Sequence, residues 1–129
     1  AMTTYKYYEV SESGRFKALS NNRQFNFTKY AKLEERYFKN CYCLKEATGS
    51  ATVLSRHLTL EDLDLMYHEI LADYGYRFTD ELWKKYFRTK SWYKPKYNNV
   101  DKRLSEVDQY NLKFIQNYLI IKTISFLEN

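Results

Sequence analysis

The chain has 129 residues and a formal net charge of +5, with 44% hydrophobic and 29% charged residues. This length suits one domain, or one domain with a small appendage, and the apolar content is high enough to bury a core. Three glycines and one proline exclude collagen-like and linker-like architectures. No run of 18 apolar residues occurs, which excludes a transmembrane helix at the level of sequence. The unusual feature is the aromatic content of 19%.

Charge is distributed unevenly along the chain. Residues 58–82 carry seven acids and one base, whereas residues 84–103 carry eight bases and one acid. The two neighbouring segments therefore have net charges of −6 and +7. Neutralisation of one segment by the other across a folded surface is favoured over a dedicated binding patch.

The cysteines and histidines do not suggest a metal site. Cys41 and Cys43 are too close in sequence for an unstrained disulfide, and His57 and His68 are the only histidines. This set does not have the ligand spacing of a zinc site, so we expect no metal and no cofactor. The N-terminus shows no recognisable signal peptide, and Ala1 before Met2 is typical of a cloning remnant.

The first half of the chain has the alternation typical of strands. Residues 6–10 and 15–19 flank a turn that ends in Gly14, which predicts a hairpin. A further strand is predicted over residues 24–30. Residues 31–46 fit both a helical stripe and a strand-like composition, with strand favoured for their later part. The sequence around Gly49, before residues 51–54, predicts another hairpin.

The second half has helical spacing. Thr59 with Asp62 predicts a capping box, and Gly75 is a suitable residue to end that first helix. A second helix is expected to begin near Thr79 or Asp80, and a third after Ser105, with a loop over residues 91–103 between them. Residues 119–127 are apolar on too many sides for a free surface helix, so they either pack on the N-terminal half or form a homodimer contact.

These elements predict an α+β fold, in which a β-rich N-terminal segment (residues 1–57) packs on a C-terminal three-helix unit (residues 58–129). The predicted core consists of apolar side chains, mostly on the helical stripes. Its members are Leu60, Leu63, Tyr67, Ile70, Phe78, Trp83, Phe87, Trp92, Val107, Phe114 and Tyr118.

Catalytic patterns are weak. His68-Glu69 begins a His-Glu-x-x-His pattern, but Ala72 stands where the second histidine is required. His68, Glu69 and Asp73 could share one side of a helix as an acid–base group, yet helical carboxylates are more often solvated or paired with bases. The three glycines stand apart and form no phosphate loop. We therefore expect that the protein is not an enzyme.

The loop after the second predicted helix contains the candidate binding residues. Large aromatic side chains next to lysines can stack on sugar or base rings while the cations bind an anionic polymer. The alternative, which we favour for the aromatics, is that they cover the helical core. The candidate ligand-binding residues are Arg88, Trp92, Tyr93, Lys94, Lys96 and Tyr97.

Residues 63–78 read Leu-Asp-Leu-Met-Tyr-His-Glu-Ile-Leu-Ala-Asp-Tyr-Gly-Tyr-Arg-Phe. This segment resembles the signature of the YARHG domain family, which is close to L-x-x-M-x-N-E-I-Y-A-R-H-G-Y-x-F. The resemblance extends over residues 58–118 and includes Ser91-Trp92-Tyr93-Lys94-Pro95. The chain departs from the pattern in four places: His68 replaces Asn, Leu71 replaces Tyr, Asp73 replaces Arg and Tyr74 replaces His.

The resemblance implies a bacterial, extracytoplasmic module of the cell envelope without an established activity. Together with the loop aromatics and the local positive charge, it predicts a non-catalytic binding or interaction module. The expected partners are cell-wall glycan, another anionic envelope polymer or an envelope protein. The alternative is a structural module that joins proteins or dimerises through residues 119–127. Binding to nucleic acid is disfavoured, and it would be recognised by a steep salt dependence.

Overall fold

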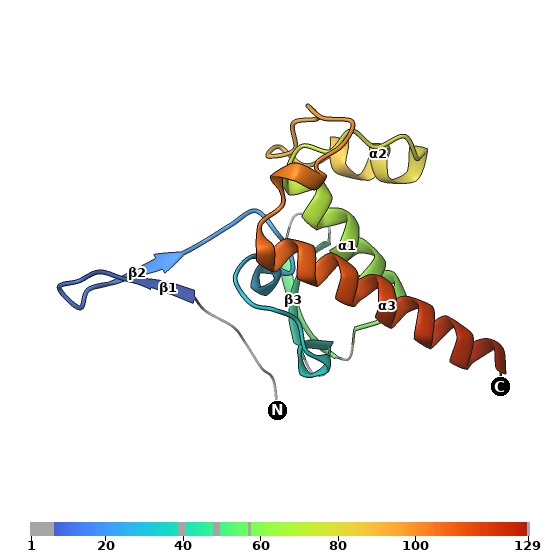
Figure 1. Ribbon diagram of the computed structural model, residues 1–129, viewed down its shortest axis with the longest axis horizontal. Helices are drawn as coiled ribbons and strands as arrows, with labels where there is room; N and C mark the ends of the chain where they lie inside the picture. Colours follow the sequence, from blue (N-terminus) through green and yellow to red (C-terminus); the bar gives the residue numbers. More distant parts are fainter. Residues whose placement is uncertain (1–6, 39–40, 48–49, 57, 129) are drawn as a thin grey trace.

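The computed structural model describes residues 7–38, 41–47, 50–56 and 58–128. It contains three α-helices, two antiparallel β-hairpins and three short 3-10 helices, which confirms the predicted α+β class (Figure 1). The α-helices are α1 (Leu60–Asp73), α2 (Glu81–Arg88) and α3 (Glu106–Glu128). The hairpins pair β1 (Tyr7–Val10) with β2 (Phe16–Leu19), and β3 (Cys41–Ala47) with β4 (Ser50–Arg56). The 3-10 helices are η1 (Asn26–Lys29), η2 (Glu35–Phe38) and η3 (Asp101–Arg103).

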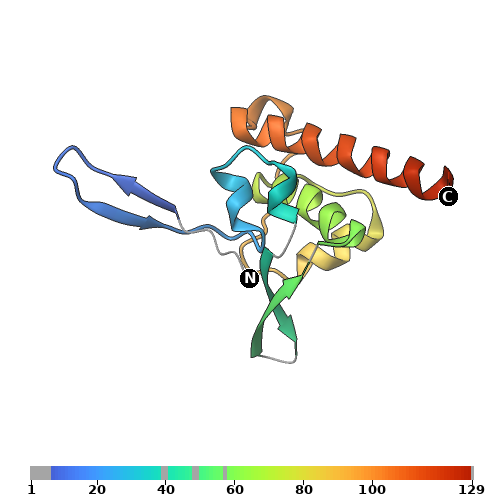
Figure 2. The ribbon, with the colours of Figure 1, turned by 90° about the horizontal axis from the view of Figure 1, so that it is seen from below.

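Both predicted hairpins are present. In the first, Tyr7 pairs with Leu19 and Val10 pairs with Phe16, and Gly14 takes a φ of +79° in the connecting turn. This hairpin projects from the body of the molecule, as Figures 1 and 2 both show. The second hairpin confirms the preference for strand in the later part of residues 31–46, whereas the earlier part forms η2.

The strand predicted over residues 24–30 is wrong, because this segment forms η1 instead. The backbone N–H groups of Gln24 and Phe25 donate to the carboxylate of Glu69 on α1. These donors are therefore unavailable to a neighbouring strand. The carbonyl of Phe25 accepts hydrogen bonds from the backbone and the hydroxyl of Thr28, which closes the 3-10 turn.

Side-chain caps fix where the helices begin. Thr59 and Asp62 form the predicted capping box at α1. Asp80 caps α2 by accepting from the backbone N–H groups of Leu82 and Trp83, and Ser105 accepts from the backbone N–H of Asp108 at the start of α3. These caps satisfy N–H groups that the first helical turn leaves unpaired.

The main core lies between α1, α3 and the segment of residues 21–38 that precedes β3. Figure 2 shows this segment beside both helices, and its Phe25, Phe27 and Leu33 are almost completely buried. The segment is held by Asn111 of α3, whose side chain accepts from the N–H of Leu33 and donates to the carbonyls of Thr28 and Ala31. Residues on both sides of the predicted boundary at 57/58 thus share one core.

The predicted core is correct at Leu63, Ile70, Phe78 and Phe87, which are buried, and wrong at Leu60, which is 41% exposed. Leu60 is the first residue of α1, and the buried apolar side chains of this helix begin at Leu63. The remaining predicted members are partly buried: Tyr67, Trp83, Trp92, Val107, Phe114 and Tyr118. The following buried apolar side chains lie outside the predicted core: Phe25, Phe27, Leu33, Tyr37, Phe38, Met66, Ala72, Val100, Leu112 and Ile115.

The second half of α3 extends past the body of the molecule (Figure 1). Leu119 packs against the main core, but Ile120, Ile121 and Ile124 are 52%, 63% and 50% exposed. Within the described part of the chain, no helix has the length and apolarity needed to cross a membrane.

Candidate functional site

The predicted loop aromatics lie where the end of α1 meets the segment before η3. Gly75 ends α1 with a φ of +82°, and its carbonyl accepts from the backbone N–H groups of Lys96 and Tyr97 at 2.8 and 3.0 Å. The N–H of Arg77 donates to the carbonyl of Tyr97 at 2.7 Å. Tyr76 and Tyr97 form an isolated parallel bridge. The lysine-bearing loop is therefore held against the end of α1 by its backbone, not only by its side chains.

This junction contains an open pocket of about 390 Å³. Its lining combines aromatic rings with three basic side chains, and Asp73 is its one acidic lining residue. The lining residues are Ala72, Asp73, Tyr74, Gly75, Trp92, Lys94, Lys96, Tyr97 and Arg103. A pocket of this volume is at the small end of the range for ligand sites, so it suits a single ring or repeat unit.

The structure brings together four of the six predicted site residues, because Trp92, Lys94, Lys96 and Tyr97 all line the pocket. Tyr93 does not line it: its hydroxyl donates to the carbonyl of Tyr76 at 2.6 Å. The ring of Tyr93 belongs to the aromatic cluster around Phe78 and Phe87. Arg88 lies on α2, exposed and outside the pocket lining.

Arg103 lines the pocket but was not among the predicted site residues. Its guanidinium stacks over the ring of Tyr97 at 3.7 Å from the centroid. The excess of bases in residues 84–103 included Arg103 but could not show that it lies beside Tyr97. Tyr74 stands out in the sequence only as a departure from the family pattern, and Asp73 as such a departure and as a member of a possible acid–base group; neither was predicted to line a binding site. They line the pocket because α1 ends there.

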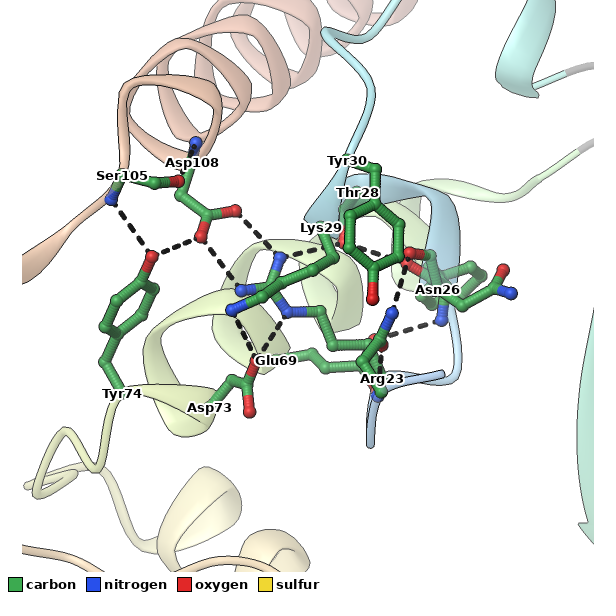
Figure 3. A network of polar contacts seen from close by, with 12 residues as sticks. Arg23, Asn26, Thr28, Lys29, Tyr30, Glu69, Asp73, Tyr74, Ser105 and Asp108 are labelled. Atoms are coloured by element: carbon green, nitrogen blue, oxygen red, sulfur yellow. Dashed lines mark hydrogen bonds and ion pairs between the residues drawn. The ribbon is translucent and has the colours of Figure 1, made fainter. Parts of the chain in front are cut away.

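A buried polar network lies directly behind the pocket (Figure 3). Arg23 reaches from the segment before η1 to two carboxylates. Its Nε donates to Asp73 Oδ2 at 2.9 Å, and its Nη1 and Nη2 donate to the two carboxylate oxygens of Asp108 at 2.7 and 2.9 Å. Tyr74 completes the network by donating its hydroxyl proton to Asp108 and accepting from the N–H of Ser105.

The electrostatics of the network follow from burial and pairing. Burial alone would raise the pKa of Asp108, but the hydrogen bonds and charge of Arg23 outweigh this effect and lower that pKa. The pKa of Arg23 is raised because its two carboxylate partners outweigh the opposing effect of burial. Burial, with the hydrogen bond to Asp108, raises the pKa of the Tyr74 hydroxyl. Asp108 is thus a buried carboxylate held ionised by a guanidinium.

Each of the three helical residues considered for acid–base chemistry has different partners in the fold. Burial raises the pKa of Glu69 to about 7, although the N–H groups of Phe25 and Gln24 favour its ionised form. Asp73 is paired with Arg23. His68 stacks on Trp83 at 4.2 Å between centroids, and its Nδ1 contacts the carbonyl of Asp64. Glu69 and Asp73 therefore hold the N-terminal segment, while His68 belongs to the aromatic cluster.

No group of three or more His, Cys, Asp or Glu residues suited to a metal ion occurs among the described residues. Cys41 and Cys43 lie in β3. The cations and rings that line the pocket offer ion pairing with an anionic group and stacking on a planar or sugar ring.

Most of the chain, including the pocket, matches the model of a known protein family. The family model described as YARHG domain matches residues 40–119, a range that includes each pocket-lining residue named above. No curated protein and no solved structure matches the chain. Residues 72–75 are the four positions at which the family pattern reads Ala-Arg-His-Gly, and here they read Ala-Asp-Tyr-Gly. Because the match covers more than half of its length, the chain belongs to the YARHG domain family.

Proposed function

We propose that this protein is a non-catalytic binding module of the cell envelope, and that its pocket holds an anionic unit of cell-wall glycan or of another envelope polymer. The observation that carries the proposal is the convergence of Lys94, Lys96 and Arg103 with Trp92 and Tyr97 around one pocket. Extracytoplasmic location is part of the same proposal and is supported by membership of the YARHG family.

The lining has the chemistry that such a ligand requires. Lysine and arginine bind phosphate and carboxylate groups, and arginine also stacks on rings. The guanidinium of Arg103 already stacks on Tyr97, which fixes its position at the pocket. Aromatic side chains bind the apolar faces of sugar rings. The combination suits a sugar or polyol that carries a negative charge.

Co-sedimentation with purified peptidoglycan tests the proposal. We expect the protein to pellet with walls that carry teichoic acid, and the pocket variant K94A/K96A/R103A to remain in the supernatant. The matched control is K84A/K85A/R88A, which removes three exposed bases from α2, outside the pocket. Equal loss of pelleting in both variants would show that only general charge is involved, and duplex DNA as competitor would reveal nucleic-acid binding.

A second candidate function is self-association through the end of α3. The observation in its favour is the exposure of Ile120, Ile121 and Ile124 on a helix that projects from the body (Figure 2). Exposed apolar patches of this kind mark interaction surfaces. Light scattering should then report a dimer that Ile121→Lys converts to a monomer. A wild-type protein that stays monomeric at high concentration would contradict it.

A further inference from the structure

The acidic lining residue of the pocket is Asp73, and an unpaired carboxylate there would repel an anionic ligand. Its side chain is 15% exposed. A pocket for anions therefore needs a cation close to Asp73.

Arg23 supplies that cation from behind the pocket. Its Nε lies 2.9 Å from Asp73 Oδ2, and its side chain is fully buried. Lys29 also approaches Asp73 Oδ2, but at 3.8 Å and with a side chain that is 37% exposed. An exposed and longer ion pair is weakened by water and salt, whereas a buried contact is weakened much less. Arg23 is thus the main compensating charge for Asp73.

We infer that Arg23 is a specificity-determining residue of this pocket: it masks the carboxylate of Asp73 and so keeps the site selective for anions. The inference rests on the proposed function for the identity of the ligand, but not for the electrostatic effect. Arg23 precedes the residues that the family model matches. The segment of residues 21–38 thus contributes to the binding site as well as to the core.

The test removes Arg23 together with Asp108, so that the fully buried carboxylate of Asp108 is not left without its partner. In R23Q/D108N both members of the fully buried pair become neutral, and the net charge of the protein does not change. Asp73 keeps its charge but loses its buried partner. The triple variant R23Q/D108N/D73N then removes the unmasked carboxylate. If R23Q/D108N does not fold, R23M/D108L reaches the same charge state with apolar side chains, which often replace buried ion pairs without loss of stability.

Two measurements are made on each folded variant. The first compares paramagnetic relaxation of the backbone amides of Lys94, Lys96 and Tyr97 by a cationic and an anionic nitroxide of equal size, which reports local electrostatic potential. The second is affinity for purified glycerol-phosphate teichoic acid, with neutral dextran as control. We expect a less positive potential and about fivefold weaker binding in R23Q/D108N. Both should return to at least the wild-type level in the triple variant.

The outcomes separate the two claims. An unchanged potential in folded R23Q/D108N, or no recovery in the triple variant, would overturn the role of Arg23. Absence of teichoic acid binding by the wild type would count against the proposed ligand. The relaxation measurement would still decide whether Arg23 masks Asp73.

Discussion

Arg23 and Asp108 are 85 positions apart in the sequence and form a bidentate pair in which both side chains are fully buried. The pair joins the N-terminal segment to the first turns of α3, and through Tyr74 it reaches the end of α1 (Figure 3). Three parts of the chain therefore meet at one guanidinium. This arrangement makes the stability of the fold and the charge of the pocket depend on the same residue.

Removing one member of this pair should be costly. Arg23→Met leaves Asp108 without its two donated hydrogen bonds, and we expect the free energy of unfolding to fall by about 3–5 kcal/mol. Urea denaturation measures the change. Arg15→Met, in the exposed turn of the first hairpin, is the control and should change the free energy by less than about 0.5 kcal/mol. Equal unfolding midpoints for the two variants would contradict the structure.

Glu69 should make the protein less stable as the pH rises from about 4.5 to about 7. Burial raises its pKa from 4.5 to about 7 in the folded state. Between these values the folded state binds more protons than the unfolded state, so the free energy of unfolding decreases with pH. The contribution is fully present below the lower value and lost above the upper one, and amounts to on the order of 1–3 kcal/mol.

The measurement is urea unfolding at several pH values. Glu69→Gln should remove this component of the pH dependence, while Glu61→Gln, an exposed position on the same helix, should leave it in place. A wild-type stability that rises steadily through the same pH window, and a Glu69→Gln variant that behaves identically, would show that the carboxyl titrates normally.

A side chain at Gly75 should destabilise the fold for two reasons, the positive φ of its backbone and a steric contact with the loop. Gly14 shares only the first of these and therefore serves as the control. Both glycines have positive φ, but a Cβ at Gly75 would lie 2.8 Å from the carbonyl oxygen of Lys94, whereas at Gly14 nothing lies within 4 Å. Gly14→Ala should therefore cost only the conformational penalty of about 1–2 kcal/mol. Gly75→Ala should cost more and also shift the Lys94–Lys96 backbone that lines the pocket.

Thermal unfolding gives the stability of each variant, and the amide spectrum of residues 92–97 shows the displacement of the loop. Similar losses of stability in both variants, with an unchanged spectrum for Gly75→Ala, would mean that the loop does not press on Gly75.

The folding unit should begin near residue 21. The first hairpin projects from the body (Figure 1), although Tyr7 of β1 packs against the main core with its ring 5.1 Å from that of Tyr30. A chain that lacks residues 1–20 should therefore retain the fold with a small loss of stability. A chain that lacks residues 1–28 loses Arg23, Phe25 and Phe27 from the core and should be unfolded. Near-ultraviolet circular dichroism of Trp83 and Trp92 reports the outcome. A native spectrum for the shorter chain would show that the helices fold without this segment.

The helical half could be predicted from sequence because its signals are local. Thr59, Asp80 and Ser105 cap helices within three residues of their own position. The first hairpin was equally accessible, since Gly14 and the flanking alternation lie close together. The structure of residues 21–38 could not be predicted in this way, because the backbone N–H groups of Gln24 and Phe25 donate to the carboxylate of Glu69, more than 40 positions away. No local pattern contains such a partner.

The candidate site likewise contains some residues that a local sequence pattern reveals and others that only the fold brings to the pocket. Trp92, Lys94, Lys96 and Tyr97 could be found because rings and bases alternate in one short segment. Arg103 and Asp73 reach the same pocket only through the fold. Whether Tyr93 covers the core or binds a ligand could not be read from composition. Its hydroxyl bond to the carbonyl of Tyr76 assigns it to the loop scaffold.

The most direct test of the central claim, that this pocket binds an anionic envelope unit, is an NMR titration. Soluble fragments from a muramidase digest of peptidoglycan that carries teichoic acid are added to the labelled full chain. We predict saturable shifts of the amides at residues 73–75, 92–94, 96–97 and 103, and none when K94A/K96A/R103A is used. Shifts confined to α2 or to the end of α3, or no saturable shift at all, would contradict the claim.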